Sequence, residues 1–236
     1  MKLKIVLGVF GLFLISMMLS QTVYAEDVIT SRTGTIMITR PDGAVFTIGK
    51  DESLPDITSG SIVVVLDGSI DIVPTAGFIQ LVVGDSAATV KPGDTISAFV
   101  DLKTGMAGFK TSSGEINVVT GNTTATVKVG QEALMSLDKT TGEVSIKSVT
   151  GVIQTVTIGV KTQVFEGRLA KISVNARTRI VHIESFRDNV LLTVVDVQGS
   201  LEDKIQTFVE TSREVELSLP EEPVEPQRPE GSPYAP

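Results

Sequence analysis

Short apolar runs separated by turn-forming residues cover most of the chain between residues 30 and 200. Val, Ile and Thr alternate with polar residues in these runs, and the runs end at Gly, Pro, Asp or Asn. Alternation with a period of two residues is typical of β-strands that bury one face, and the spacing of an amphipathic helix is hard to find here. The pattern therefore predicts an all-β protein.

One stretch of the chain repeats itself with an offset of 37 residues. Residues 77–84 (GFIQLVVG) return as residues 114–121 (GEINVVTG), and residues 88–93 (ATVKPG) return as residues 125–130 (ATVKVG). Self-similarity at a fixed period indicates a supersecondary unit that has been laid down at least twice. A degenerate third copy upstream is an open alternative, because Gly68 lies one repeat length before Gly105.

Turn signals between apolar runs predict β-hairpins. Residues 35–39 and 44–48 flank Arg40-Pro41-Asp42-Gly43, residues 61–66 and 70–73 flank Asp67-Gly68, and strands inside the two repeats flank 101–105 and 138–142. Asp can accept hydrogen bonds from the backbone just after it, and Gly adopts positive φ, so both suit tight turns. The predicted architecture is a set of glycine-punctuated β-hairpin repeats in a solenoid-like or sandwich-like domain.

The chain divides into five segments. Residues 1–25 are a signal peptide, 26–160 a β-repeat domain, 161–200 additional strands that pack on or extend it, and 201–218 a short helix or strand. Within the third segment, residues 189–197 form the most apolar strand candidate, which predicts burial on both faces. Residues 219–236 are rich in Pro and Glu, which predicts a disordered, solvated tail.

The first residues predict export. Lys2 and Lys4 precede an uncharged apolar run over 5–19, and Val23-Tyr24-Ala25 places small residues before a cleavage point at Glu26. An uncleaved membrane anchor is the alternative, although the run is shorter than the roughly 20 residues that span a bilayer. We expect a periplasmic or secreted protein of the bacterial cell envelope.

Composition narrows the function classes. The chain has no Cys and a formal charge of −8, with acidic groups in excess over 26–160 and 201–236 and basic groups slightly in excess over 161–200. Stability must therefore come from core burial and strand pairing. An acidic chain without a basic stripe is a poor nucleic-acid binder, because that affinity depends on Lys and Arg.

Catalytic and metal-binding signals are weak. His182 is the chain's one histidine, and it would extend a strand face that includes Ile172 and Val174; no Gly-x-Ser-x-Gly motif accompanies it. Asp67, Asp71, Asp101 and Asp138 recur at predicted turns and could bind Ca²⁺ if stacked repeats brought them together, but turn formation explains them with fewer assumptions. We expect no enzyme activity, no metal and no cofactor.

Arg177 and Arg179 are the candidate docking residues. The alternation of residues 176–180 places both arginines on one face of a predicted strand, where they would dock an acidic partner or the acidic tail of a neighbouring subunit. A solvated outer strand face is the simpler explanation of the same pattern.

The repeat resembles the FecR domain, an extracytoplasmic all-β module of bacterial sensors and envelope proteins. The resemblance covers residues 33–150 and rests on residues 34–48, on Gly114-Glu115-Ile116-Asn117-Val118 and on 127–133 (VKVGQEA). It implies a curled set of strands that acts by contact with proteins or ligands. Sensor members carry a cytoplasmic anti-sigma segment before their membrane helix, whereas only residues 1–4 precede the apolar run here, so sigma-factor control does not carry over.

These observations together predict a non-enzymatic exported protein that acts as a binding or structural β module. Its partner would be an envelope protein or surface polymer, and strand edges could also support a homo-oligomer. A membrane-anchored sensor ectodomain of FecR type is the first alternative. An exported hydrolase is the last, because proton-transfer groups and metal ligands are sparse.

Overall fold

The protein is all-β, as the sequence predicts. A computed structural model describes residues 28–199 and 206–207, which form 19 strands in two sheets. The predicted signal peptide, the predicted 219–236 tail and most of 201–218 lie outside the described residues. In spatial order, sheet A contains β1 (Ile29–Arg32), β5 (Ser69–Ile72), β8 (Thr95–Val100), β9 (Ala107–Ser113), β12 (Glu132–Leu137), β13 (Val144–Thr150), β16 (Arg168–Val174), β17 (Ile180–Arg187) and β18 (Val190–Gln198).

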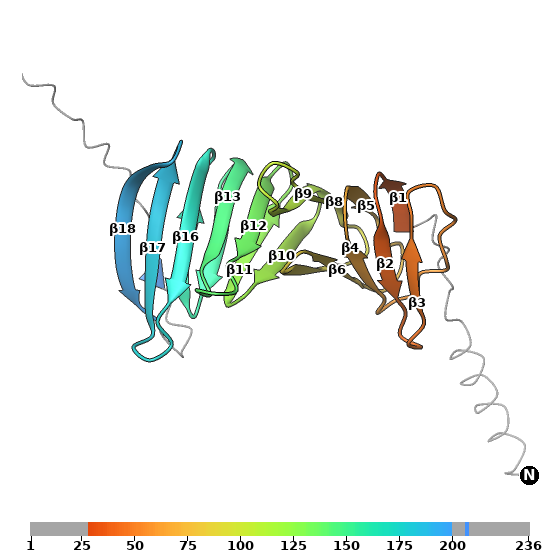
Figure 1. Cartoon of the computed structure of the whole chain (residues 1–236), viewed down its shortest axis with the longest axis horizontal. Coiled ribbons are helices and arrows are strands. Elements are labelled where there is room, and N and C mark those ends of the chain that lie inside the picture. The colour runs from red at the N-terminus through yellow and green to blue at the C-terminus, as the bar shows by residue number, and fades with distance from the viewer. Residues whose placement is uncertain (1–27, 200–205, 208–236) are drawn as a thin grey trace, which may run out of the picture.

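Sheet B faces sheet A across a shared core. In the same direction, from the N-terminal end, it contains β3 (Val45–Ile48), β2 (Ile36–Thr39), β4 (Ile62–Val65), β6 (Ile79–Val83), β7 (Ser86–Val90), β10 (Glu115–Thr120), β11 (Thr123–Lys128), β14 (Ile153–Thr157), β15 (Val160–Val164) and β19 (Gln206–Thr207). Of the two predicted arrangements, the sandwich-like one describes this pair of sheets. Figure 1 shows an elongated molecule with β1–β3 at one end and β17–β18 at the other.

The chain crosses between the sheets one hairpin at a time. β6–β7 and β10–β11 lie in sheet B, and the hairpins that follow each of them, β8–β9 and β12–β13, lie in sheet A. Each 37-residue repeat is therefore one hairpin from each sheet. We call residues 77–113 unit 1 and residues 114–150 unit 2.

A third copy lies downstream of these two. β14–β15 and β16–β17 repeat the same two hairpins over residues 151–187, which we call unit 3. Unit 3 spans residue 160, where the sequence analysis placed a change of organisation. The upstream alternative is wrong, because β4 and β5 on either side of Gly68 lie in different sheets, whereas β8 and β9 on either side of Gly105 form a hairpin.

The hairpin predictions hold at three places and fail at one. β2–β3, β8–β9 and β12–β13 are antiparallel hairpins across the predicted turns. β4 and β5 lie in different sheets, so Asp67-Gly68 is a corner and not a hairpin turn. Two contacts with the segment before β2 hold this corner. The Asp67 carboxylate accepts a hydrogen bond from the Thr35 backbone N–H at 3.0 Å. The backbone of Gly34 lies so close to Gly68 that a Cβ there would be 2.8 Å from it, so the corner requires glycine.

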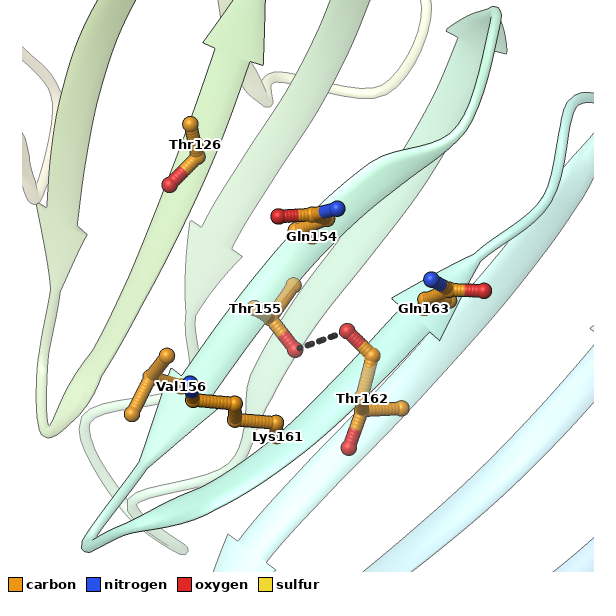
Figure 2. A pocket seen from close by; sticks show the side chains of 7 residues that line it. All are labelled: Thr126, Gln154, Thr155, Val156, Lys161, Thr162 and Gln163. Atoms are coloured by element: carbon orange, nitrogen blue, oxygen red, sulfur yellow. Dashed lines mark hydrogen bonds between the residues drawn. The ribbon is translucent and has the colours of Figure 1, made fainter. Parts of the chain in front are cut away.

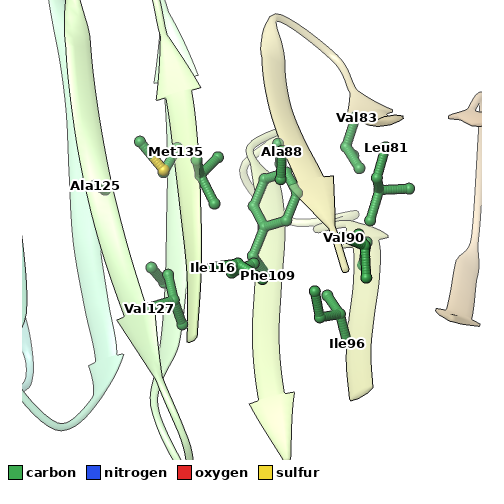
Figure 3. Packing of buried hydrophobic residues seen from close by; sticks show 14 of the residues in the cluster. Leu81, Val83, Ala88, Val90, Ile96, Phe109, Ile116, Ala125, Val127 and Met135 are labelled. Carbon is green, nitrogen blue, oxygen red and sulfur yellow. The ribbon is translucent and has the colours of Figure 1, made fainter. Parts of the chain in front are cut away.

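A single apolar core runs between the sheets. Equivalent positions of the three units are buried, among them Ile79, Ile116 and Ile153 in sheet B, and Phe109, Ile146 and Ile183 in sheet A. Figure 3 shows part of this core, with Phe109 from β9 packed among side chains of sheet B. Full burial of such a side chain stabilises the fold by about 1.5–3 kcal/mol, so the core can hold the chain together without disulfides.

The same turn closes the sheet A hairpin of every unit. Asp138 Oδ1 accepts hydrogen bonds from the backbone of Thr140 at 2.8 Å and Thr141 at 3.3 Å, and Asp101 and Asn175 act in the same way in units 1 and 3. Hydrogen bonds from the backbone of Thr140 and Thr141 lower the pKa of Asp138, and hydrogen bonds from Thr104 lower the pKa of Asp101. These two carboxylates therefore serve turn formation, which was the simpler of the two explanations.

Loop 49–60 closes the N-terminal end of the sandwich. It follows β3, the edge strand of sheet B, and its carbonyl groups at Lys50 and Glu52 accept hydrogen bonds from Arg32 Nη2 at 3.0 and 2.8 Å. Arg32 belongs to β1, the edge strand of sheet A, so the loop bridges both edges. Its residue Ile57 is fully buried in the core, and Leu54 packs against it.

Candidate interaction surface at the C-terminal end

Exposed large apolar side chains of the described chain gather on β18, the last strand of sheet A. At nine residues it is also the longest strand described. Its described pairing is with β17 alone, in register from Ile180↔Gln198 to Arg187↔Val190. A strand with one pairing partner presents a row of backbone N–H and C=O groups on its other side, and such a row can accept another strand.

The side chains of β18 are unusually apolar for an edge. Val190, Leu191, Leu192 and Val194 are 62, 49, 45 and 48% exposed. No charged residue and no proline lies between Asp188 and Asp196. The expected burial of this segment on both faces is therefore wrong for the single chain, because Leu191 and Val194 lie on the outer face of sheet A and remain about half exposed there.

β18 is apolar on both faces. Cross-strand partners share a face of a sheet, so Leu191 lies with Phe186 and Leu169 on the outer face. On the inner face, Val197 pairs with Val181 and both are buried. β18 also carries a bulge. Ser185 pairs with Thr193 and Phe186 pairs with Leu191, so Leu192 is an extra residue without a partner in β17.

The other sheet edges are better protected than β18, whose one protective feature of this kind is its bulge. β1 and β3 have four residues each, and β1 contains a register shift between Ile29 and Ser31. β3 lies between Arg40-Pro41-Asp42 and Lys50-Asp51-Glu52. β15 pairs with β19 at Val160↔Gln206 and Lys161↔Thr207. Short edges, bulges, charges and prolines are the usual means by which proteins block edge-to-edge association.

Arg177 and Arg179 lie in a turn, and not on a strand face as the sequence predicts. Residues 175–179 connect β16 to β17, and both arginines are exposed there. The Asn175 side chain accepts hydrogen bonds from the backbone of Arg177 and Thr178, which explains why alternation stops at this point. The turn contacts the end of β18, because the Gly199 N–H donates to the Arg179 carbonyl at 2.8 Å.

His182 lies on the outer face of sheet A. The expected face shared with Ile172 and Val174 is wrong, because the 175–179 turn intervenes and His182 pairs with Ser173. Its Nδ1 lies 2.7 Å from Asp196 Oδ1, and its Nε2 lies 3.4 Å from Glu184 Oε1. Hydrogen bonds to Asp196 and then Glu184 raise the pKa of His182. This cross-strand pair fastens β18 to β17 at an exposed surface.

A shallow depression of about 410 Å³ lies beside the β14–β15 hairpin of sheet B. Figure 2 shows the amide side chains of Gln154 and Gln163 on neighbouring strands, with Thr126 from β11 beside them. Lys161 is its one charged lining residue. The lining holds no carboxylate and no imidazole, so acid–base chemistry has no donor pair here. Within the described ranges, no group of three or more His, Cys, Asp or Glu could hold a metal ion.

Sequence patterns alone did not show that β18 is an edge strand. A continuous apolar run is typical of a central strand, and nothing in the run itself shows that the sheet stops beside it. The signal that could have located the edge is the 37-residue period. Counting it forward from Gly151 places the end of unit 3 at Arg187 and leaves β18 as a strand without a following unit.

No family model matches this chain, and neither the curated proteins nor the solved structures contain a match. The resemblance to the FecR domain therefore stays a prediction. Among the described residues, no helix is long and apolar enough to cross a membrane.

Proposed function

We propose that this chain is a non-enzymatic protein of the bacterial cell envelope that is exported and acts as a binding or structural β module. The observation that carries the proposal is the contrast between its two ends. Loop 49–60 covers the N-terminal end, whereas β18 presents a long apolar edge. An edge of this kind binds an extended segment of another protein by main-chain hydrogen bonds and selects it by side-chain contacts.

The non-enzymatic part of the proposal is supported by the environment of His182. Both of its ring nitrogens have carboxylate partners, and the group lies on an open sheet face. General acid–base groups work in sites that position a substrate and exclude water. In a broad hydrolase screen we expect wild-type protein and the His182→Ala variant to be equally inactive. A hydrolytic activity that the variant loses would contradict this part.

Export is tested by intact-mass measurement of the chain expressed with its leader in a bacterial host. We expect the protein in the periplasm or medium, with Glu26 as its first residue. A mass that retains Met1 in a membrane fraction would instead support the anchored-sensor alternative. A mass that retains Met1 in the cytoplasm would contradict export in both forms.

Binding is tested with a double variant of the edge, Leu191→Lys with Val194→Lys. Both side chains are about half exposed, so the lysines can reach solvent while the fold is retained. We expect cross-linking in intact cells to yield adducts of the wild-type chain and far fewer of the variant. Val45→Lys, at the exposed edge strand β3, is the matched control and should leave the adducts unchanged.

A further inference from the structure

We infer that the open C-terminal end binds a second copy of this chain, with β18 of one copy antiparallel to β18 of the other across a two-fold axis. The inference rests on the proposed function, because it takes β18 as the docking edge and names the occupant. Sheet A would then continue from one copy into the other, and the two sandwiches would lie end to end.

The first argument is the mismatch between the pattern of β18 and its surroundings. The run from Asn189 to Val195 has the composition of a strand buried on both faces, with no charge and no proline. In the single chain, four of its large apolar side chains are 45–62% exposed. In the dimer, β18 of the second copy would form hydrogen bonds with the free edge of β18. The exposed apolar side chains of the two β18 strands would then contact one another.

The second argument is the cap at the opposite end. Head-to-tail association would require β18 to pair with β1 or β3, but both are short strands and loop 49–60 bridges them. A contact between two different surfaces can continue into a filament, whereas a contact between two identical surfaces closes as a dimer. Because loop 49–60 blocks the N-terminal end, head-to-tail association is disfavoured, and the contact between two β18 strands is the association that remains possible.

The third argument concerns the chain's own continuation. The chain leaves β18 at Gly199, and its next described residues, Gln206 and Thr207, pair with β15 in sheet B. Acidic residues outnumber basic ones threefold over 201–236. A charged, proline-rich segment matches an apolar edge poorly, because burying charge without a partner is costly.

The experiment is sedimentation velocity of the full exported chain over a wide concentration range. We expect a concentration-dependent species of twice the chain's mass and no larger series. The double variant Leu191→Lys with Val194→Lys should lose this species, because lysines at the facing edges would repel one another. Val45→Lys and Val119→Lys alter exposed valines on β3 and on the outer face of sheet B, and both should keep it.

A second measurement uses the absence of cysteine from the chain. Val194→Cys introduces the protein's single thiol at the central residue of β18. Under mild oxidation we expect a disulfide-linked dimer of this variant, since a two-fold axis at the centre of the paired strands brings residue 194 of both copies together. Val45→Cys carries an equally accessible thiol at the capped end and should remain largely unlinked.

Each alternative has its own outcome. A wild-type protein that stays monomeric, with slow hydrogen exchange along the free side of β18, would show that the chain covers its own edge and would overturn the inference. A monomer with fast exchange there would also overturn it. If the lysine variant then still lost its cross-linked adducts in cells, the proposed function would survive with a different partner. A ladder of larger species would replace the closed dimer by head-to-tail growth.

A salt titration separates this contact from docking through Arg177 and Arg179. Pairing through apolar β18 should persist at high salt, whereas an arginine-based contact weakens as salt screens it. The variant Arg177→Ser with Arg179→Ser should therefore keep the dimer. Loss of the dimer in this variant, together with loss in high salt, would overturn pairing through β18.

Discussion

Arg179 has a positive φ at a turn position where units 1 and 2 have glycine. Its φ is 58°, and Gly105 and Gly142 occupy the same turn position with φ of 71° and 73°. A non-glycine residue in this region costs about 1 kcal/mol or more. We expect Arg179→Gly to raise the free energy of unfolding by about 1 kcal/mol, as measured by urea denaturation.

The reverse exchange in unit 2 is the matched control for Arg179. Gly142→Arg places a side chain at the same positive φ and should lower the free energy of unfolding, although nothing lies within 4 Å of the new Cβ. If both variants changed stability in the same direction, backbone strain at this turn position would not be the cause.

His182 should make stability depend on pH through its contacts with Asp196 and Glu184. A raised pKa means that the native state holds the proton more tightly than the unfolded chain, whose value is near 6.5. The stabilisation is therefore complete below that value and is lost as the pH rises through the higher value of the folded state. Because the side chain is 40% exposed, we expect no more than about 1 kcal/mol.

The measurement compares wild type with His182→Gln by urea denaturation at about pH 5.5 and about pH 8.5. Wild type should be the more stable at the lower pH, and the difference should close at the higher pH. Asp196→Asn removes the principal partner and should give nearly the same pH dependence as His182→Gln. A wild-type advantage that grows with pH would contradict the assigned direction of the pKa shift.

At the scale of elements, buried hydroxyl pairs join each unit to the next. Ser86 Oγ and Thr120 Oγ1 lie 2.6 Å apart between β7 and β10, and Thr123 Oγ1 and Thr157 Oγ1 lie 2.7 Å apart between β11 and β14. All four residues are buried. Each hydroxyl group has its partner on the neighbouring unit, so these pairs tie the register of sheet B across unit boundaries.

A double-mutant cycle measures the second of these pairs. Thr157→Val leaves the buried Thr123 hydroxyl without its partner and should destabilise the fold by about 1–3 kcal/mol. Thr123→Val with Thr157→Val removes both polar groups and should cost clearly less than the sum of the single changes. Additive effects would show that the two hydroxyl groups do not depend on each other.

Strands and most turns could be predicted because their determinants are local. Asp138 accepts hydrogen bonds from the two residues that follow it, and the strands that flank it alternate with a period of two. Unit 3 was missed for the same reason. Compared with unit 2, unit 3 has Asn175 in place of Asp, Arg179 in place of Gly and Val160 in place of Thr. The structure therefore repeats although the amino-acid sequence does not.

The corner at Asp67-Gly68 and the edge at β18 could not be predicted from local signals. Asp67 looks like a turn residue in the sequence, but its carboxylate is held by Thr35, which lies 32 residues away. The exposure of Leu191 depends on which strand is the last of its sheet. Both features are set by contacts between distant residues, and a pattern read along the chain does not contain them.

At the scale of the molecule, contacts pass mainly between neighbouring units. Such stacks gain stability from each unit and from its interfaces, so inner units are held on two sides and outer strands on one. We expect native-state hydrogen exchange to be slowest in β10–β13 and faster toward both ends. β1 should exchange more slowly than β18 in the monomer, because loop 49–60 bridges its end. Uniform protection over all strands would instead indicate a single cooperative block.

The equal spacing of the units has a consequence for size. Ser113 is followed by Gly114, and excision of residues 114–150 would join Ser113 to Gly151, which recreates the same dipeptide at the same corner. The shortened protein would keep its closed end and its open end and would lose one hairpin from each sheet, or about 10 Å of length. The length of the sandwich is therefore adjustable in steps of one unit, without any change to the surfaces at its two ends.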